Sequence, residues 1–209
     1  MTKKRMVIFA SGRGSNAEAL HEAVENGTIN AEIKALVTDI PGAACIDKAK
    51  SWGVPVIVAD RKSFASKQAF EQYILDAIAP YAADVICLAG FMRLLSSDFI
   101  SHYEHKIINI HPALLPSFRG LHAQGQAVAA GVKIAGCTVH FVVPDMDAGP
   151  IILQSAVPVL EDDTEDTLAA RILTKEHPTY VRAVQLFCDD KLTIDGNVVR
   201  GTQDRKSVV

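Results

Sequence analysis

The chain has 209 residues, 49% of them hydrophobic, which is enough for one well-buried domain and too few for two full ones. Its 21 lysines and arginines nearly balance 24 aspartates and glutamates, and a net charge of -3 gives no basic field for nucleic acid. The apolar run behind the basic start ends at Ser11, too early for a signal sequence or a membrane span. We therefore expect a cytoplasmic protein that binds neither membranes nor nucleic acid.

Strand-like and helix-like segments alternate along the first half of the chain. Short apolar runs predict strands at Met6–Ala10, Ile33–Thr38, Val56–Ala59, Val85–Ala89 and Ile107–His111. Helical spacing predicts helices that begin near Ala17, cover Ala43–Trp52, run from Ser63 or Ser66 toward Ile78, and extend from Ser97 to about Tyr103. Five βα units in a row favour a Rossmann-like, doubly wound parallel sheet with helices on both faces.

The pattern changes in the second half of the chain. Strand-like segments at Ile134–Val143 and Ile151–Val157 are joined by a loop with no helical pattern, which predicts an antiparallel pair. A long helix is expected from Thr164, and Pro178 is expected to kink or interrupt it. Residues Leu192–Arg200 predict a terminal hairpin. The predicted fold class is α/β, with a mostly parallel sheet and an antiparallel C-terminal part.

A glycine-rich segment, residues 12–17 (GRGSNA), lies between the first predicted strand and the first predicted helix. Glycines allow a sharp turn, the first N–H groups of a helix bind anions, and Ser15 and Asn16 add side-chain donors. The string also fits the dinucleotide fingerprint, and Asp39 falls where that fingerprint has a ribose-binding acid. We predict phosphate binding of some kind here, with a plain tight turn as the alternative.

A second unusual segment, Gly90–Leu95, follows the fourth predicted strand with large apolar or amphipathic side chains. One interpretation is a helix that packs its apolar face. The other is a slot for a flat aromatic ligand whose polar edges are recognised by backbone groups. The sequence favours neither interpretation over the other.

Asn109 and His111 end the fifth predicted strand and should share one face, because alternate residues of a strand point the same way. An amide donor beside a titratable ring suits a reaction that develops an oxyanion and moves a proton. In the loop after Pro144, Asp147 is a better partner for His111 than Asp145, although loops also carry aspartate for turns. An acid beside His111 would favour the imidazolium, which donates to an oxyanion.

The sequence has no pattern typical of a metal site or of a catalytic cysteine. No spacing of histidines and acids resembles a zinc or iron site, so no metal is expected. The four cysteines form no CxxC pair and are expected to be reduced and buried, with a nucleophilic cysteine as the minor alternative.

The chain resembles the phosphoribosylglycinamide formyltransferases, a family of folate-dependent enzymes. The resemblance covers nearly the whole chain and rests on residues 12–16 (GRGSN), 88–93 (LAGFMR), 109–116 (NIHPALLP), 136–142 (GCTVHFV) and 146–154 (MDAGPIILQ). It implies the formyltransferase fold and the transfer of a formyl group from 10-formyltetrahydrofolate to the glycine amine of N1-(5-phospho-D-ribosyl)glycinamide, a step of purine synthesis.

The resemblance also implies roles for individual residues. The catalytic residues are then Asn109, His111 and Asp147. The ribonucleotide is bound by Gly14, Ser15, Asn16 and Glu176, although the neighbouring Leu173 departs from a polar residue seen in some members. The folate is bound by Lys67, Met92, Arg93, Leu94, Leu95, Asn109, Val143 and Asp147.

The expected organisation is a single domain, 1–209, with a ribonucleotide-phosphate half (1–105) and a folate and catalytic half (106–209). It is expected to act on small molecules, as a monomer or a homodimer. Related enzymes are less suitable, because methionyl-tRNA formyltransferase carries an added C-terminal domain and formyltetrahydrofolate hydrolase an added N-terminal one. An NAD-dependent dehydrogenase would use the glycine segment and Asp39 but leave His111 without a purpose, and a non-catalytic nucleotide-binding module would explain the glycine segment alone.

Overall fold

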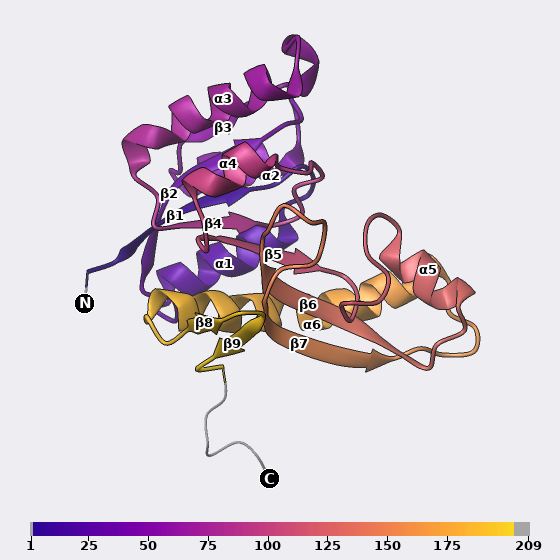
Figure 1. Cartoon of the computed structure of the whole chain (residues 1–209). Helices are drawn as coiled ribbons and strands as arrows, with labels where there is room; N and C mark the ends of the chain where they lie inside the picture. The colour runs from indigo at the N-terminus through magenta and orange to yellow at the C-terminus, as the bar shows by residue number, and fades with distance from the viewer. Residues whose placement is uncertain (1, 203–209) are drawn as a thin grey trace. The chain divides into compact units, whose positions relative to one another are not determined.

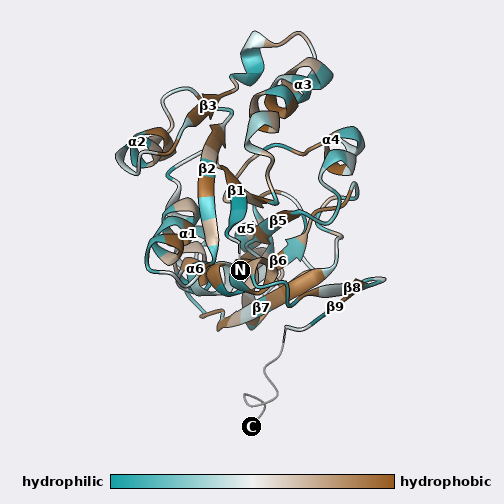
Figure 2. Ribbon diagram, turned by 90° about the vertical axis from the view of Figure 1, so that its left-hand side faces the viewer, coloured by the Kyte–Doolittle hydropathy of each residue, from teal (hydrophilic) through white to brown (hydrophobic). Residues whose placement is uncertain are grey.

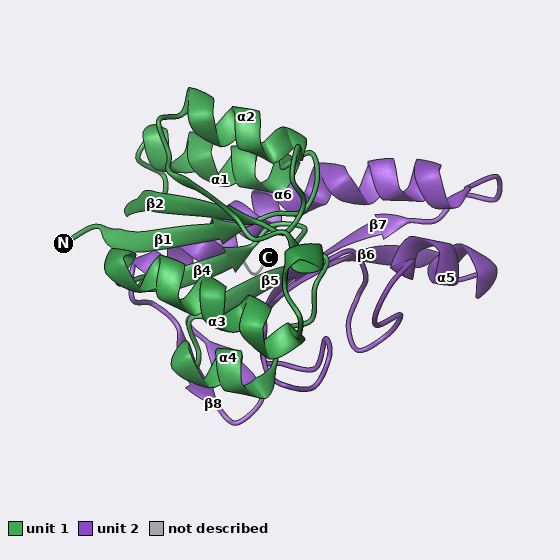
Figure 3. Cartoon of the chain, turned by 90° about the horizontal axis from the view of Figure 1, so that it is seen from above, with its two compact units in different colours: residues 1–109 green, residues 110–209 purple. Residues whose placement is uncertain are grey.

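The computed structural model describes residues 2–202 of the chain (Figure 1). The chain divides into two compact units, residues 1–109 and 110–209, which Figure 3 colours separately. The functional halves expected from the sequence, 1–105 and 106–209, stay a prediction, because compactness alone does not assign a role to either unit.

The first unit is built on parallel strands in the order β3-β2-β1-β4-β5. The strands are β1 (Lys4–Phe9), β2 (Ala31–Thr38), β3 (Val56–Val58), β4 (Val85–Leu88) and β5 (Ile107–His111), the last of which crosses into the second unit. The helices are α1 (Ser15–Glu25), α2 (Ala44–Ser51), α3 (Lys67–Ile78) and α4 (Ser97–His102), with short 3-10 turns at η1 (Arg61–Ser63) and η2 (Ala79–Tyr81).

Helices cover both faces of this parallel sheet. Figure 3 shows α1 and α2 on one face and α3 and α4 on the other. Both faces of β4 are therefore shielded, and all of its residues are buried, as its uninterrupted apolar sequence predicts. Figure 2 shows hydrophobic colour along β3 and much of β2, although β3, at the edge of the sheet, is only partly buried. The predicted doubly wound parallel arrangement is confirmed for this part of the chain.

The strand order reverses beside β1. The chain moves outward from β1 through β2 to β3 and then returns to β4 on the other side of β1. In open parallel sheets, ligands bind at the carboxyl ends of the strands where the order reverses in this way. The backbone N–H of Ser11, just after β1, donates to the carbonyl of Gly90, just after β4, at 3.1 Å. The two segments singled out in the sequence, residues 12–17 and Gly90–Leu95, therefore begin side by side.

An ion pair joins β1 to the start of β4 at the opposite end of these strands. The guanidinium of Arg5 donates to both carboxylate oxygens of Asp84, with Nη2 at 2.8 Å from Oδ1 and Nε at 2.9 Å from Oδ2. These charged hydrogen bonds favour the carboxylate and lower the pKa of Asp84 to about 2.

The second unit combines antiparallel strands with a long helix. Its elements are α5 (Ala123–Ala129), β6 (Ile134–Phe141), β7 (Ile151–Pro158), α6 (Glu165–Cys188), β8 (Thr193–Asp195) and β9 (Val198–Arg200). Strands β6 and β7 pair antiparallel, β9 pairs parallel with β7, and β8 pairs antiparallel with β9. Helix α6 packs against β6 and β7, with buried residues such as Leu168, Ile172 and Tyr180 on its inner face. The antiparallel C-terminal part and the terminal hairpin are confirmed.

One local prediction is wrong in part, and one helix was missed. Helix α6 is not interrupted at Pro178 but continues to Cys188. Proline removes one helical hydrogen bond, and the burial of Thr179 and Tyr180 directly beyond it offsets that loss. The short helix α5 was not predicted, because its sequence of small and amide residues has no apolar period. The bounds of the predicted strands differ from the observed ones by no more than two residues.

Within residues 2–202, no helix is both long enough and apolar enough to cross a bilayer.

Candidate active site

The glycine segment forms a tight turn from β1 into α1. Gly14 caps the helix in a left-handed conformation, with φ 72° and ψ 31°. A Cβ atom at this position would lie 2.8 Å from Cβ and 3.3 Å from Cα of Cys45, in the neighbouring helix α2. The backbone N–H of Cys45 donates to the carbonyl of Gly12 at 3.1 Å, which holds α2 against the turn. Both the backbone angle and the packing therefore require glycine at position 14.

Gly14→Ala should destabilise the protein more than Gly27→Ala. Both glycines have a positive φ, but a Cβ at Gly27 would meet nothing within 4 Å. Each substitution adds left-handed strain of about 1–2 kcal/mol, and only Gly14→Ala adds a collision, worth roughly 1–3 kcal/mol in a packed site. Urea unfolding of both variants measures the difference. Equal losses would show that the contact with Cys45 imposes no constraint.

The segment Gly90–Leu95 is a loop, so the interpretation as a packed helix is wrong. Phe91 is buried and meets Phe9 of β1 edge to face, with ring centroids 5.2 Å apart. Leu95 is also buried, whereas Met92 and Leu94 are exposed. The loop is thus anchored by two apolar side chains and presents two others to solvent, an arrangement suited to contact with an apolar ligand.

Lys67 begins helix α3 and lies near the end of the same loop. Its Nζ is 3.7 Å from Oε1 of Glu71, a buried acid that also accepts hydrogen bonds from the backbone N–H and the hydroxyl of Ser96. Beside them is a hollow of about 400 Å³, lined by Lys67, Gln68, Glu71, Gln72, Leu75, Ser96 and Asp98. Lys67 therefore has an acidic partner within the protein, and the negative charge of Glu71 partly offsets the positive charge that Lys67 would present to a ligand.

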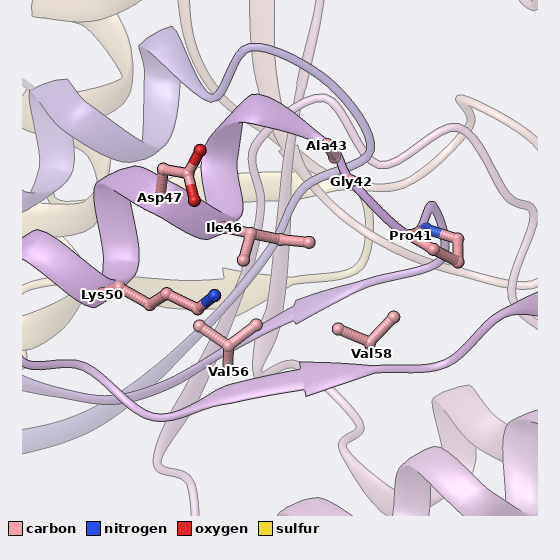
Figure 4. Close-up of a pocket in the computed structure, with 8 residues that line it drawn as sticks. All are labelled: Pro41, Gly42, Ala43, Ile46, Asp47, Lys50, Val56 and Val58. Atoms are coloured by element: carbon pink, nitrogen blue, oxygen red, sulfur yellow. The ribbon is translucent and has the colours of Figure 1, made fainter.

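A further hollow of about 360 Å³ lies between α2 and β3 (Figure 4). Ile46, Val56 and Val58 form its apolar wall, and Asp47 and Lys50 lie at its helical side. None of the residues predicted to bind or react with substrate lines this hollow. We assign no function to it.

Asn109 and His111 lie on β5, where they were expected. In the register with β4, Asn109 is opposite Leu88. Alternation along the strand gives both side chains the same face of β5. Asn109 is half-buried, and His111 is buried. The amide and the ring thus stand two residues apart at the carboxyl end of a parallel strand.

His111 has an oxygen atom near each of its ring nitrogens. Its Nε2 lies 2.9 Å from the carbonyl oxygen of Phe118, and its Nδ1 lies 3.6 Å from Oδ2 of Asp147. The backbone N–H of Gly120 donates to the same Asp147 oxygen at 2.8 Å, which fixes the carboxylate. The contact at Nε2 is within hydrogen-bond distance, whereas the contact at Nδ1 is longer than a hydrogen bond. The structure thus brings together His111 and Asp147, which are far apart in the sequence.

His140 on β6 is a further neighbour of Asp147 that received no role from the sequence. Its Nε2 lies 3.9 Å from Oδ1 of Asp147, and its Nδ1 lies 2.9 Å from the carbonyl of Phe141. Burial lowers the pKa of His140, so this ring is neutral at pH 7. The carboxylate therefore stands between two imidazoles. The sequence signal was weak: His140 shares its strand face with Thr138, but one histidine in an apolar strand is usually structural.

The other residues expected at the site are distributed over the second unit. Glu176 is buried on α6, and Val143 is half-buried in the loop after β6. Burial raises the pKa of the Cys137 thiol to about 11, and the negative charge of Glu176 contributes to this rise. Burial likewise raises the pKa of Cys45. These two thiols are thus protonated at neutral pH, which disfavours a nucleophilic role for them.

The described residues were expected to hold no metal site. Across residues 2–202, no group of three or more histidine, cysteine, aspartate or glutamate side chains could hold a metal ion together.

The chain belongs to the formyl transferase family, because the family model described as "Formyl transferase" matches residues 4–184. It is 38% identical to the phosphoribosylglycinamide formyltransferase of Escherichia coli (strain K12) over 192 residues, which cover 92% of this chain and 91% of that protein. The crystal structure of glycinamide ribonucleotide transformylase 1 from Symbiobacterium toebii superposes with a TM-score of 0.93 at 41% identity, over 95% of this chain and 93% of that one. The predicted formyltransferase fold is confirmed.

Some relatives are much longer than this chain. The trifunctional purine biosynthetic protein adenosine-3 of Bos taurus is 40% identical over 93% of the chain, but the chain spans only 19% of that protein's length.

Proposed function

We propose that this chain transfers the formyl group of 10-formyltetrahydrofolate to the glycine amine of N1-(5-phospho-D-ribosyl)glycinamide, a step of purine biosynthesis. The observation that carries the proposal is the contact of His111 with Asp147 at the end of β5, two residues beyond Asn109. These side chains supply donors and a proton carrier, which acyl transfer to an amine requires. Membership of the formyl transferase family supports the same reaction.

The reaction begins with the attack of the neutral amine on the formyl carbon. An α-amino group titrates near pH ~8, so a useful fraction is free base at pH 7. The attack forms the C–N bond and turns the formyl oxygen into an oxyanion. The amide N–H of Asn109 and an N–H of His111 stabilise it, each well-placed donor being worth about 3 kcal/mol.

The tetrahedral intermediate then collapses toward products. The bond from the formyl carbon to N10 of the folate breaks, and its electron pair stays on N10. The new ammonium loses one proton and N10 gains one, so charge and atoms balance. His111 carries this proton directly, or a water held by Asp147 relays it. The backbone N–H of Gly120 holds the Asp147 carboxylate in place for this step, and the rings of His111 and His140 lie on either side of it.

Binding is assigned to the remaining residues of the proposal. The phosphate of the ribonucleotide lies on Gly14, Ser15 and Asn16 at the positive end of α1. Glu176 accepts hydrogen bonds from polar groups of the same substrate. The folate contacts Met92, Arg93, Leu94, Leu95 and Val143, and Lys67 attracts its glutamate tail. A cytoplasmic location, a monomeric or homodimeric state and chemistry without a metal stay predictions.

Two rival functions use parts of the same residues. A formyltetrahydrofolate hydrolase would deliver water to the formyl carbon in place of the amine. A dinucleotide-binding dehydrogenase would use Asp39 to bind a ribose. Asp39 is buried, its Oδ1 accepts a hydrogen bond from Ser11 and its Oδ2 accepts one from Arg93, so it is poorly placed to bind a ribose.

A transfer assay tests the proposal. The purified chain is mixed with 10-formyltetrahydrofolate labelled in the formyl carbon, with or without the ribonucleotide. We expect label in the glycinamide product only when the ribonucleotide is present. Release of labelled formate at the same rate without the ribonucleotide would favour the hydrolase and contradict the proposal.

A further inference from the structure

Asp39 is a buried carboxylate with no part in the chemistry proposed above. It follows β2 directly, and its side chain is only 1% exposed. Ser11 Oγ donates to its Oδ1 at 2.5 Å, and Arg93 Nε donates to its Oδ2 at 2.7 Å. A buried carboxylate is costly unless its oxygens are paired, so this arrangement is a specific one.

The Ser11 hydroxyl extends the contact to the backbone of the loop after β4. Its oxygen accepts a hydrogen bond from the N–H of Met92 at 2.9 Å while its hydrogen goes to Asp39. Asp39 therefore holds the loop twice, through the main chain of Met92 and through the side chain of Arg93. The segments that follow β1, β2 and β4 meet in this one cluster.

The charge on Asp39 matters for this geometry. A carboxylate accepts at both oxygens, so it receives the Ser11 hydroxyl and the Arg93 Nε–H at the same time. Asparagine has one acceptor oxygen and must turn N–H toward one of these donors. The bond to Arg93 engages Nε, which leaves the Nη1 and Nη2 groups of this half-exposed side chain for other acceptors.

We propose that Asp39 is a positioning residue that sets Met92 and Arg93 for folate binding. The inference rests on the proposed function for the identity of the ligand. Asp39 does not touch the reacting atoms, and its effect passes through Ser11 and Arg93. Its loss should therefore weaken the binding of the folate much more than that of the ribonucleotide or the chemical step.

The test compares Asp39→Asn with Asp84→Asn. Both variants remove a carboxylate paired with an arginine of the same unit, but Asp84 lies at the opposite end of the strands. For Asp39→Asn we expect the KM for 10-formyltetrahydrofolate to rise about tenfold, the usual effect of losing a charged hydrogen bond. We expect kcat and the KM for the ribonucleotide to stay within about twofold. Asp84→Asn should leave all three unchanged.

Two further measurements separate this inference from the proposed function. Amide hydrogen exchange at Met92 should speed up in Asp39→Asn and not in Asp84→Asn, whatever the enzyme's reaction. Ser11→Ala is a smaller change and should also speed up amide exchange at Met92, with a smaller rise in the KM for 10-formyltetrahydrofolate. It replaces Asp39→Asn in the test if that variant does not fold.

The outcomes are distinct. An active wild type with an unchanged folate KM in Asp39→Asn and Ser11→Ala overturns the positioning role and leaves the proposed function intact. Equal rises in both substrate KM values overturn it as well, since they indicate a general loss of structure. A wild type that neither turns over nor binds 10-formylfolate overturns the proposed function and the folate role of Asp39 together, and Met92 exchange then decides whether Asp39 orders the loop.

Discussion

His111→Ala should lower kcat by at least about a thousandfold while 10-formylfolate still binds. The substitution removes one oxyanion donor, worth roughly 10²–10³ in rate, and the proton carrier, worth roughly 10²–10⁴. The His111 ring is itself not among the residues assigned to the folate, although its neighbour Asp147 is, so binding should be kept. Steady-state kinetics and a 10-formylfolate titration measure the two effects.

Controls make the result specific to the His111 ring. His111→Gln keeps an N–H donor but cannot carry a proton, so its kcat should lie between those of the wild type and His111→Ala. His102→Ala removes an exposed histidine on α4 and should change nothing. A folded His111→Ala variant with near-normal turnover would remove His111 from the mechanism.

Asn109→Ala should lower kcat by about 10²–10³ with little change in KM, because a single oxyanion donor is lost and it acts mainly in the transition state. Asn109→Asp has nearly the same shape but would place an anion against the developing oxyanion. We expect it to be slower than Asn109→Ala. The kcat values of both variants, measured at saturating substrates, decide between a donor and an acceptor.

The aspartate variant is the sharper of the two. If Asn109→Asp retained wild-type kcat, the side chain would act as an acceptor and not as an oxyanion donor. Urea unfolding of both variants checks that any loss of rate does not come from loss of the fold.

Much of the fold could be predicted because short stretches of sequence indicate it. The apolar run of β4 and the glycine segment between β1 and α1 can each be recognised from neighbouring residues alone. Helix α5 was not predicted, because its seven mostly small or amide residues show no helical spacing of apolar side chains. A kink or an interruption was predicted at Pro178 from the proline itself, but packing along α6 keeps the helix continuous there.

The candidate site was less accessible to sequence reasoning, because its contacts join distant segments. Asn109 and His111 could be paired from strand alternation. The approach of Asp147 to His111 depends on how the loop carrying Gly120 folds, which no local pattern encodes. Asp39 shows the converse problem. Its place after β2 suggested a ribose ligand, whereas the structure pairs it with Ser11 and Arg93.

The most direct test is a crystal structure of the chain with 10-formylfolate and N1-(5-phospho-D-ribosyl)glycinamide bound together. The account predicts the formyl oxygen within about 3 Å of the Asn109 amide nitrogen and a ring nitrogen of His111. It also predicts the phosphate on the N–H groups that follow Gly12. A formyl group remote from both side chains, or a phosphate bound elsewhere, would contradict the account.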